Sequence, residues 1–334
     1  MSEQKQRIEY IDLAKGICIL LVVFHHCRGY FEVPDYRILR AVTFFMMPLF
    51  FFLSGLVFNP YESYLGFLKR KINKLIIPFL FFHVIWTFLF AIIHEEPVQW
   101  HTLYNFLYTQ KDFLNGPVWF LVCLFWLNQM FYGIYAISFK TKYPLIILGT
   151  LSVGIGILGF IMGGTDYNIK AMNIGTAMSA MPFFCAGFIF KHQDILRPAR
   201  WDKWLLPIAV VLALYTFLVA QGKANWNLNI YEANAWITYS CAFSGVLCIL
   251  AIAKTINYIP IISYFGRYSI MLLVTHIPLS SVILPKFYKI GINNGLLASL
   301  LFVTVIALSY LVWIPIMKRY LPYVTAQKDL LKTT

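Results

Sequence analysis

The first apolar stretch of the chain carries polar side chains of types that could do chemistry. Asp12, Lys15, His25, His26 and Arg28 flank a run of apolar residues there. On an α-helix, the steps from Lys15 to His26 turn about 1100° and rise about 16 Å, which is within roughly 20° of three whole turns. Lys15 and His26 therefore share one face of the expected helix. Asp12 lies within about 40° of the same stripe, whereas His25 faces elsewhere.

A neutral imidazole can take a proton from a hydroxyl near pH 7 and return it within one reaction cycle. This property makes His26 a candidate general base. The competing interpretation is that His25 and His26 cap the helix near the outer membrane surface and hydrogen-bond to neighbouring helices or water. Lys15 taken alone fits a cationic anchor at the cytosolic surface.

A second histidine, His276, follows Arg267 in a later apolar stretch. The helical rise between these two residues is roughly 13 Å, which places His276 near the middle of a bilayer. An ionisable residue at that depth indicates a functional site, and a structural histidine bonded to its neighbours explains the same pattern. We take His276 as the second candidate catalytic residue.

The elements that must position these residues are transmembrane helices. The 334 residues are 60% hydrophobic, 18% aromatic and 12% charged, with a mean hydropathy of +0.70. No single water-soluble domain hides so much apolar surface. The same composition excludes a disordered chain and a disulfide-stapled secreted module. The net charge of +13 does not indicate a nucleic-acid partner, because membrane topology also produces basic loops.

Apolar runs between the charges predict an all-α protein of about ten transmembrane helices in one integral domain, residues 1–334. The expected spans are 13–30, 41–58, 75–93, 117–138, 144–162, 176–190, 204–220, 235–253, 268–284 and 295–317. Alternate loops hold most of the Lys and Arg residues, including Lys140, Lys254 and Arg319. The positive-inside rule therefore predicts a multi-pass cell-membrane protein with both termini in the cytoplasm.

The six cysteines fall in or beside the expected spans and lack Cys-x-x-Cys spacing. We expect them to be buried packing residues, with no disulfide and no metal site.

Four stretches of the chain resemble motifs of the acyltransferase-3 family of integral membrane O-acyltransferases. They are Asp12–His26, in which ten positions separate Lys15 from His26, then Met47–Gly55, Gly116–Leu121 and Phe265–His276. These stretches follow the family's order, and the resemblance covers most of the chain. The lysine at position 15 and the preceding Asp12 most resemble the fucose 4-O-acetylase-like branch.

This resemblance implies transfer of an acyl group, usually acetyl, from cytosolic acetyl-CoA to a hydroxyl of a cell-surface or lipid-linked glycan. The acceptor would be an exopolysaccharide, a lipopolysaccharide or a lipid-linked saccharide, and acetyl-CoA would be a donor substrate rather than a bound cofactor. In this scheme His26 is the base and Lys15 lies near the donor. Arg28 or Trp119 would donate to the developing oxyanion, with Asp12 and Arg267 in supporting positions.

The stretch between the second and third spans is expected to be an inner loop with a basic cluster. The cluster consists of Lys69, Arg70, Lys71 and Lys74, with Glu62 as its only acid. Such a cluster can attract the phosphates of coenzyme A or anionic lipid headgroups, and both interpretations stay open. Pro78 is expected to end or kink the start of the third span.

A transporter or flippase of lipid-linked saccharides is the alternative function, since it would also be apolar, basic inside and furnished with intramembrane charges. The expected outer loops, including 94–116, mix acids with aromatic residues, which suits either carbohydrate binding or an interfacial belt. The acids are Glu32, Asp35, Glu95, Glu96, Asp112, Asp166 and Glu232. The sequence predicts neither the oligomeric state nor the acceptor sugar.

Overall fold

The computed structural model describes residues 8–31, 33–34, 36–110, 113–192, 200–287 and 294–332, apart from the side chains of residues 192, 200 and 201. Within these residues, ten helices are long and apolar enough to cross a membrane. The expected all-α multi-pass fold is therefore confirmed. Glu32, Asp35 and Asp112 lie outside the described residues.

The first half of the chain forms helices that alternate with short turns. They are α1 (Glu9–Gly29), α2 (Arg37–Leu56), α3 (Tyr64–Lys71), η1 (Ile72–Ile76), α4 (Ile77–His94), α5 (Thr102–Asn105), η2 (Gly116–Val118), α6 (Trp119–Ser138) and α7 (Pro144–Met162).

The second half adds further helices and one small hairpin. They are η3 (Ala171–Asn173), α8 (Ile174–His192), η4 (Arg200–Trp204), α9 (Leu205–Val219), β1 (Ala224–Asn225), β2 (Ile230–Tyr231), α10 (Ala235–Ile256), α11 (Pro260–Arg267), α12 (Ser269–Phe287), α13 (Asn294–Leu308), η5 (Ser309–Trp313) and α14 (Ile314–Tyr320).

Nine of the ten expected spans match these helices with small shifts at their ends, and the third begins earlier than expected. A continuous helix runs over Tyr64–His94 and includes α3, η1 and α4. The stretch 61–74 is thus not an inner loop: Ser63 caps α3 by accepting a hydrogen bond from Gly66 N at 3.1 Å. The charged residues hid this helix from a search for apolar runs.

Two π-helical segments, η1 and η5, interrupt the long helices. An α-helix follows each segment directly, and a proline is the second residue of that helix: Pro78 in α4 and Pro315 in α14. A proline has no N–H to give to the carbonyl four residues back and its ring crowds that carbonyl, so the preceding turn widens. The expected kink at Pro78 takes this form.

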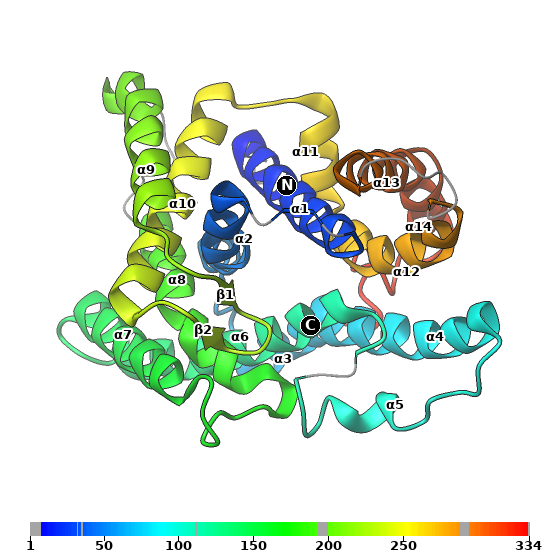
Figure 1. Ribbon diagram of the computed structural model, residues 1–334. Helices are drawn as coiled ribbons and strands as arrows, with labels where there is room; N and C mark the ends of the chain where they lie inside the picture. The colour runs from blue at the N-terminus through cyan, green and yellow to red at the C-terminus, as the bar shows by residue number, and fades with distance from the viewer. Residues whose placement is uncertain are drawn as a thin grey trace, which may run out of the picture.

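Helix α1 lies in the interior of the protein, against α2, α10, α11, α12 and α13 (Figure 1). Its closest neighbour is α11. A Cβ atom added to Gly16 would overlap the carbonyl of Ile262, and one added to Gly266 would overlap the carbonyl of Asp12. These glycines let the two backbones touch, as small residues do in membrane helix pairs. The contact fixes α11, and with it Arg267, against the polar face of α1.

The segment after α4 turns back along this helix. His83 Nε2 lies 3.0 Å from the carbonyl oxygen of Thr102, and Trp86 Nε1 donates to the carbonyl of Leu114 at 3.1 Å. Both contacts lie roughly 12 to 16 Å from the end of α4. Within residues 94–110 and 113–116, the expected outer loop therefore includes the short helix α5 and packs against α4, and its position outside the membrane stays a prediction. Irregular backbone is tolerated at such depth when protein covers it.

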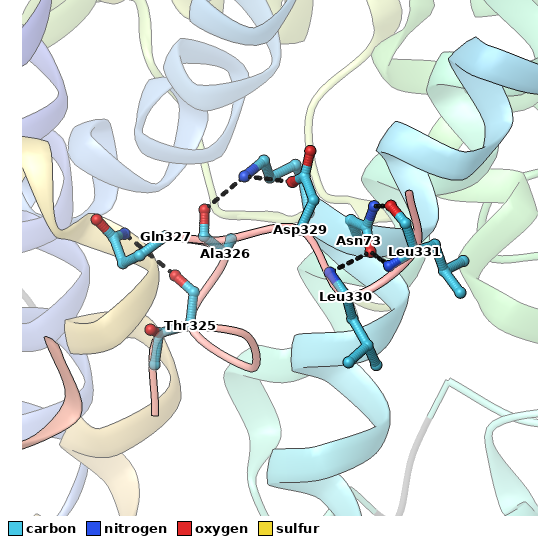
Figure 2. A network of polar contacts seen from close by, with 8 residues as sticks. Asn73, Thr325, Ala326, Gln327, Asp329, Leu330 and Leu331 are labelled. Carbon is cyan, nitrogen blue, oxygen red and sulfur yellow. Dashed lines mark hydrogen bonds and ion pairs between the residues drawn. The ribbon is translucent and has the colours of Figure 1, made fainter. Parts of the chain in front are cut away.

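The C-terminal segment packs on η1 (Figure 2). Asn73 is fully buried; its Nδ2 donates to the carbonyl of Leu331 at 2.8 Å, and its Oδ1 accepts from the backbone N–H groups of Leu330 and Leu331. Lys74 adds an ion pair with Asp329 at 2.9 Å. The tail is therefore a packed part of the fold.

The β1–β2 hairpin also carries buried side chains. Trp226 is 2% exposed and donates from Nε1 to the carbonyl of Phe44 at 3.2 Å. It therefore braces α2 and is not available to stack on a sugar. All six cysteines are buried and free, as expected.

Candidate active site

Two histidines from distant parts of the chain face each other inside the helix bundle. The ring of His26 on α1 and the ring of His276 on α12 lie 5.2 Å apart between centroids, with an interplanar angle of 48°. His25 lies beside His26, with 5.9 Å between ring centroids. The fold thus joins the two candidate catalytic residues, although the sequence gives no signal that they meet.

The environment of His276 defines which of its nitrogen atoms is available. His276 is fully buried, and its Nδ1 lies 2.8 Å from the carbonyl oxygen of Leu272. Because a carbonyl only accepts, the neutral ring carries its hydrogen on Nδ1 and keeps a lone pair on Nε2. Nε2 is buried and has no partner among the described residues. A buried lone pair of this kind can accept a proton from a hydroxyl.

Lys15 lines a cavity of about 150 Å³ that does not include the histidine pair. Like His26, Lys15 is on the side of α1 that faces α12. Ser54 of α2, Phe120 and Leu121 of α6, and Leu273 of α12 also line this cavity. Ser54 donates from Oγ to the carbonyl of Phe50 at 2.8 Å. That bond within one helix is typical of a structural serine, and it agrees with the interpretation of Ser54 as a helix contact.

Lys15 and His26 both face α12. Lys15 shares its cavity with residues of α12, and His26 faces His276 of the same helix. The helical spacing predicted this shared face, and the structure confirms it.

Asp12 and Arg267, both expected near the site, form an ion pair. Arg267 Nε lies 3.6 Å from Asp12 Oδ2, and Arg267 Nη2 lies 3.5 Å from Glu9 Oε1. Asp12 is only 5% exposed, so Arg267 supplies charge compensation to a buried carboxylate. This pair holds α11 and α1 together one turn before Lys15.

Arg28 and Trp119 were the expected oxyanion donors. Arg28 lies in the last turn of α1, two residues after His26. Trp119 is buried at the start of α6, directly before Phe120 and Leu121 of the Lys15 cavity. Arg28 is thus close to His26 along α1, and Trp119 is close to the Lys15 cavity along α6. Their role in oxyanion binding stays a prediction.

The expected coenzyme A cluster lies on α3 and η1, where three of its four members contact other protein groups. Arg70 lies over the ring of Tyr61 at 4.6 Å and Lys71 over the ring of Phe67 at 5.2 Å. Lys74 donates to the carbonyl of Ala326 at 2.8 Å in addition to its ion pair with Asp329. Lys69 has no such partner among the described residues. The structure does not test whether the cluster binds a phosphate.

Sequence reasoning missed two features near these residues. One is the contact of Asn73 and Lys74 with the tail, for which no signal exists in the local sequence. The other is Asn115, directly before Gly116–Leu121; it is 1% exposed and bonds to α12 at the carbonyl of Val274. The signal for Asn115 was Pro278, which deprives that carbonyl of its helical donor.

In the described part of the chain, no three His, Cys, Asp or Glu side chains gather in a way that could hold a metal ion. A family model described as an acyltransferase domain matches residues 8–314, nearly the whole chain. No curated protein and no solved structure matches the chain significantly.

Proposed function

Because this chain belongs to the acyltransferase-3 family of membrane acyltransferases, we propose that it transfers an acetyl group from cytosolic acetyl-CoA to a glycan hydroxyl. The acceptor is a cell-surface or lipid-linked glycan. Among the branches of the family, Asp12 and Lys15 favour the fucose 4-O-acetylase-like one. The basic loops favour cytoplasmic termini and a location in the cell membrane.

The observation that carries this proposal is the pairing of His26 with His276, whose Nε2 is buried and has no partner in the described part of the chain. A histidine of this pair removes the proton from the acceptor hydroxyl as its oxygen attacks the thioester carbonyl. The carbon–sulfur bond then breaks, and the proton passes to the departing thiolate. The products are the acetyl ester and free coenzyme A, so no oxidant or further reactant is needed.

The donor reaches this pair from the side of Lys15. The Lys15 cavity supports this route because it lies on the same face of α1 as His26, between α1, α2, α6 and α12. Lys69 and Arg70 of the basic cluster attract the phosphates at the membrane surface. Arg28 or Trp119 donates to the oxyanion that forms in the transition state.

The test is acetyl transfer by membranes that contain the protein. Labelled acetyl-CoA is supplied, and label is counted in extracted envelope glycans and in released coenzyme A. Wild-type protein is expected to label the glycans, whereas His26→Ala is not. His94→Ala is the matched control, because His94 is an exposed histidine at the end of α4. Movement of lipid-linked saccharide across the membrane without acetyl transfer would contradict the proposal and favour a transporter.

A further inference from the structure

A cavity of about 400 Å³ lies between α4, α12 and α14. Ile85 and Leu89 of α4 and Val282 of α12 form part of its wall and remain 40%, 42% and 45% exposed. In a transmembrane protein, such exposed apolar side chains face the hydrocarbon of the bilayer. We call this cavity the α4–α12 groove. Its natural occupant is therefore a hydrocarbon chain.

Asn115 also lines this groove, and its amide orientation is fixed by a hydrogen bond. Its Nδ2 donates to the carbonyl of Val274 at 2.8 Å. Pro278 lies four residues after Val274 and has no N–H, so the carbonyl of Val274 lacks its usual helical donor. Asn115 supplies the missing donor. The other end of the amide is therefore the acceptor Oδ1.

Oδ1 of Asn115 is buried and has no partner among the described residues. A buried acceptor without a donor is costly, so an occupant of the groove that brings an O–H or N–H is favoured. A saturated hydrocarbon chain by itself has no such donor. A lipid with a hydroxyl or an amide N–H beside its chain does.

The groove also lies beside the part of α12 that carries His276. Val274 and Thr275 line it, and His276 is the next residue along α12. A chain in the groove would bring its polar end to the level of His276.

We propose that the α4–α12 groove holds the hydrocarbon chain of a membrane lipid whose hydroxyl or amide N–H donates to Asn115 Oδ1. The proposal deepens the proposed function and rests on it: this lipid is the membrane anchor of the glycan acceptor. The groove thus selects acceptors that are attached to a lipid.

The test is photolabelling of the full-length protein in nanodiscs with two probes. One probe is a long-chain alcohol that carries a diazirine, and the other is its methyl ether, which has the same chain and no donor. We expect the alcohol to label peptides of α4 and α12 severalfold more than the ether does. Asn115→Leu should abolish this difference. Val282→Trp should reduce labelling by both probes, because the indole fills the groove.

Val153→Trp is the matched control, since Val153 is 49% exposed on α7, away from the groove. It should leave the labelling of α4 and α12 unchanged. Equal labelling by alcohol and ether, as expected if only water meets Asn115 Oδ1, would overturn the proposal. Labelling spread evenly over the lipid-facing helices would also overturn it. Labelling needs no acyl transfer, so a protein that labels as expected but transfers no acetyl would contradict the proposed function and the assignment of the lipid as the anchor of the acceptor, whereas the lipid site itself would stand.

Discussion

The histidine pair and the basic cluster are both polar groups on transmembrane helices, but the fold treats them differently. The ring of His276 lies beside that of His26, and its buried Nε2 has no partner among the residues that the structure describes. In the cluster, Lys71 lies over an aromatic ring and Lys74 is bound by the tail. A polar group left unsatisfied in an apolar interior is costly, and in the proposed mechanism the substrate completes it.

This difference separates two kinds of contribution. In the proposed mechanism the histidine pair does the chemistry, so its loss should reduce the rate of acyl transfer. The cluster partly serves to hold η1 and the tail, so its loss should change stability and the attraction of the donor. The four predictions that follow test this division, from the largest expected effect to the smallest.

Removal of either histidine should have the largest effect. We expect His26→Ala and His276→Ala each to lower kcat on the order of a hundredfold or more, because a positioned base contributes about that much. Steady-state kinetics in nanodiscs, with melting temperature as the check on folding, measure this. The exposed His94→Ala variant should keep its rate. Near-normal activity in the His26 or the His276 variant would exclude that histidine as a catalytic residue.

Lys15→Ala should weaken binding of the donor. A charged hydrogen-bond partner contributes about 1.5 to 3 kcal/mol, so KM for acetyl-CoA should rise about tenfold or more while KM for the acceptor changes little. Titration of each substrate at saturating levels of the other separates the two values. Lys140→Ala, at an exposed loop lysine, is the control. An unchanged KM for acetyl-CoA would remove Lys15 from the donor site.

Asn73→Ala should loosen the tail and leave the chemistry intact. The variant loses the three hydrogen bonds that the Asn73 side chain makes with the backbone of Leu330 and Leu331. We expect the free energy of unfolding to fall by about 1–3 kcal/mol and the tail to become sensitive to protease. Lys328→Ala, on an exposed part of the same tail, should do neither. A loss of kcat comparable to that of His26→Ala would contradict the division between the two regions.

Lys69→Ala and Arg70→Ala should have the smallest effects. Partly exposed charges at a membrane surface steer a polyanionic donor but bind it weakly, so KM for acetyl-CoA should rise about twofold at low salt. The difference should disappear at high salt, because ions screen the attraction. Kinetics at two ionic strengths show this, with Lys142→Ala as the control. A salt-independent increase would indicate direct phosphate binding instead.

Much of the fold was predictable because hydrophobicity and helical period are local properties. Ten apolar runs gave ten helices, and the spacing of Lys15 and His26 placed both side chains toward α12. The predicted start of the third span was wrong, because Lys69–Lys74 interrupt the apolar pattern although the helix continues through them. Charged side chains at a helix end can extend toward the membrane surface, and hydropathy does not detect this.

The contacts between distant segments could not be predicted. The pairing of His26 with His276 joins residues 250 positions apart in the sequence, and the bond of Asn73 to Leu331 joins residues 258 apart. Such pairs depend on how helices pack, and a single sequence contains no local signal for that packing. The contact of Asn115 was predictable in part. Pro278 signals that the carbonyl of Val274 lacks a helical donor, but the sequence does not say which residue supplies one.

The most direct test of the account is whether the folded protein binds acetyl-CoA at the Lys15 side of the site. Calorimetry on purified protein in nanodiscs measures this for wild type, Lys15→Ala and His26→Ala. We predict binding on the order of micromolar for wild type and for His26→Ala, and a marked loss for Lys15→Ala. Absence of binding by wild-type protein shown to be folded would contradict the account.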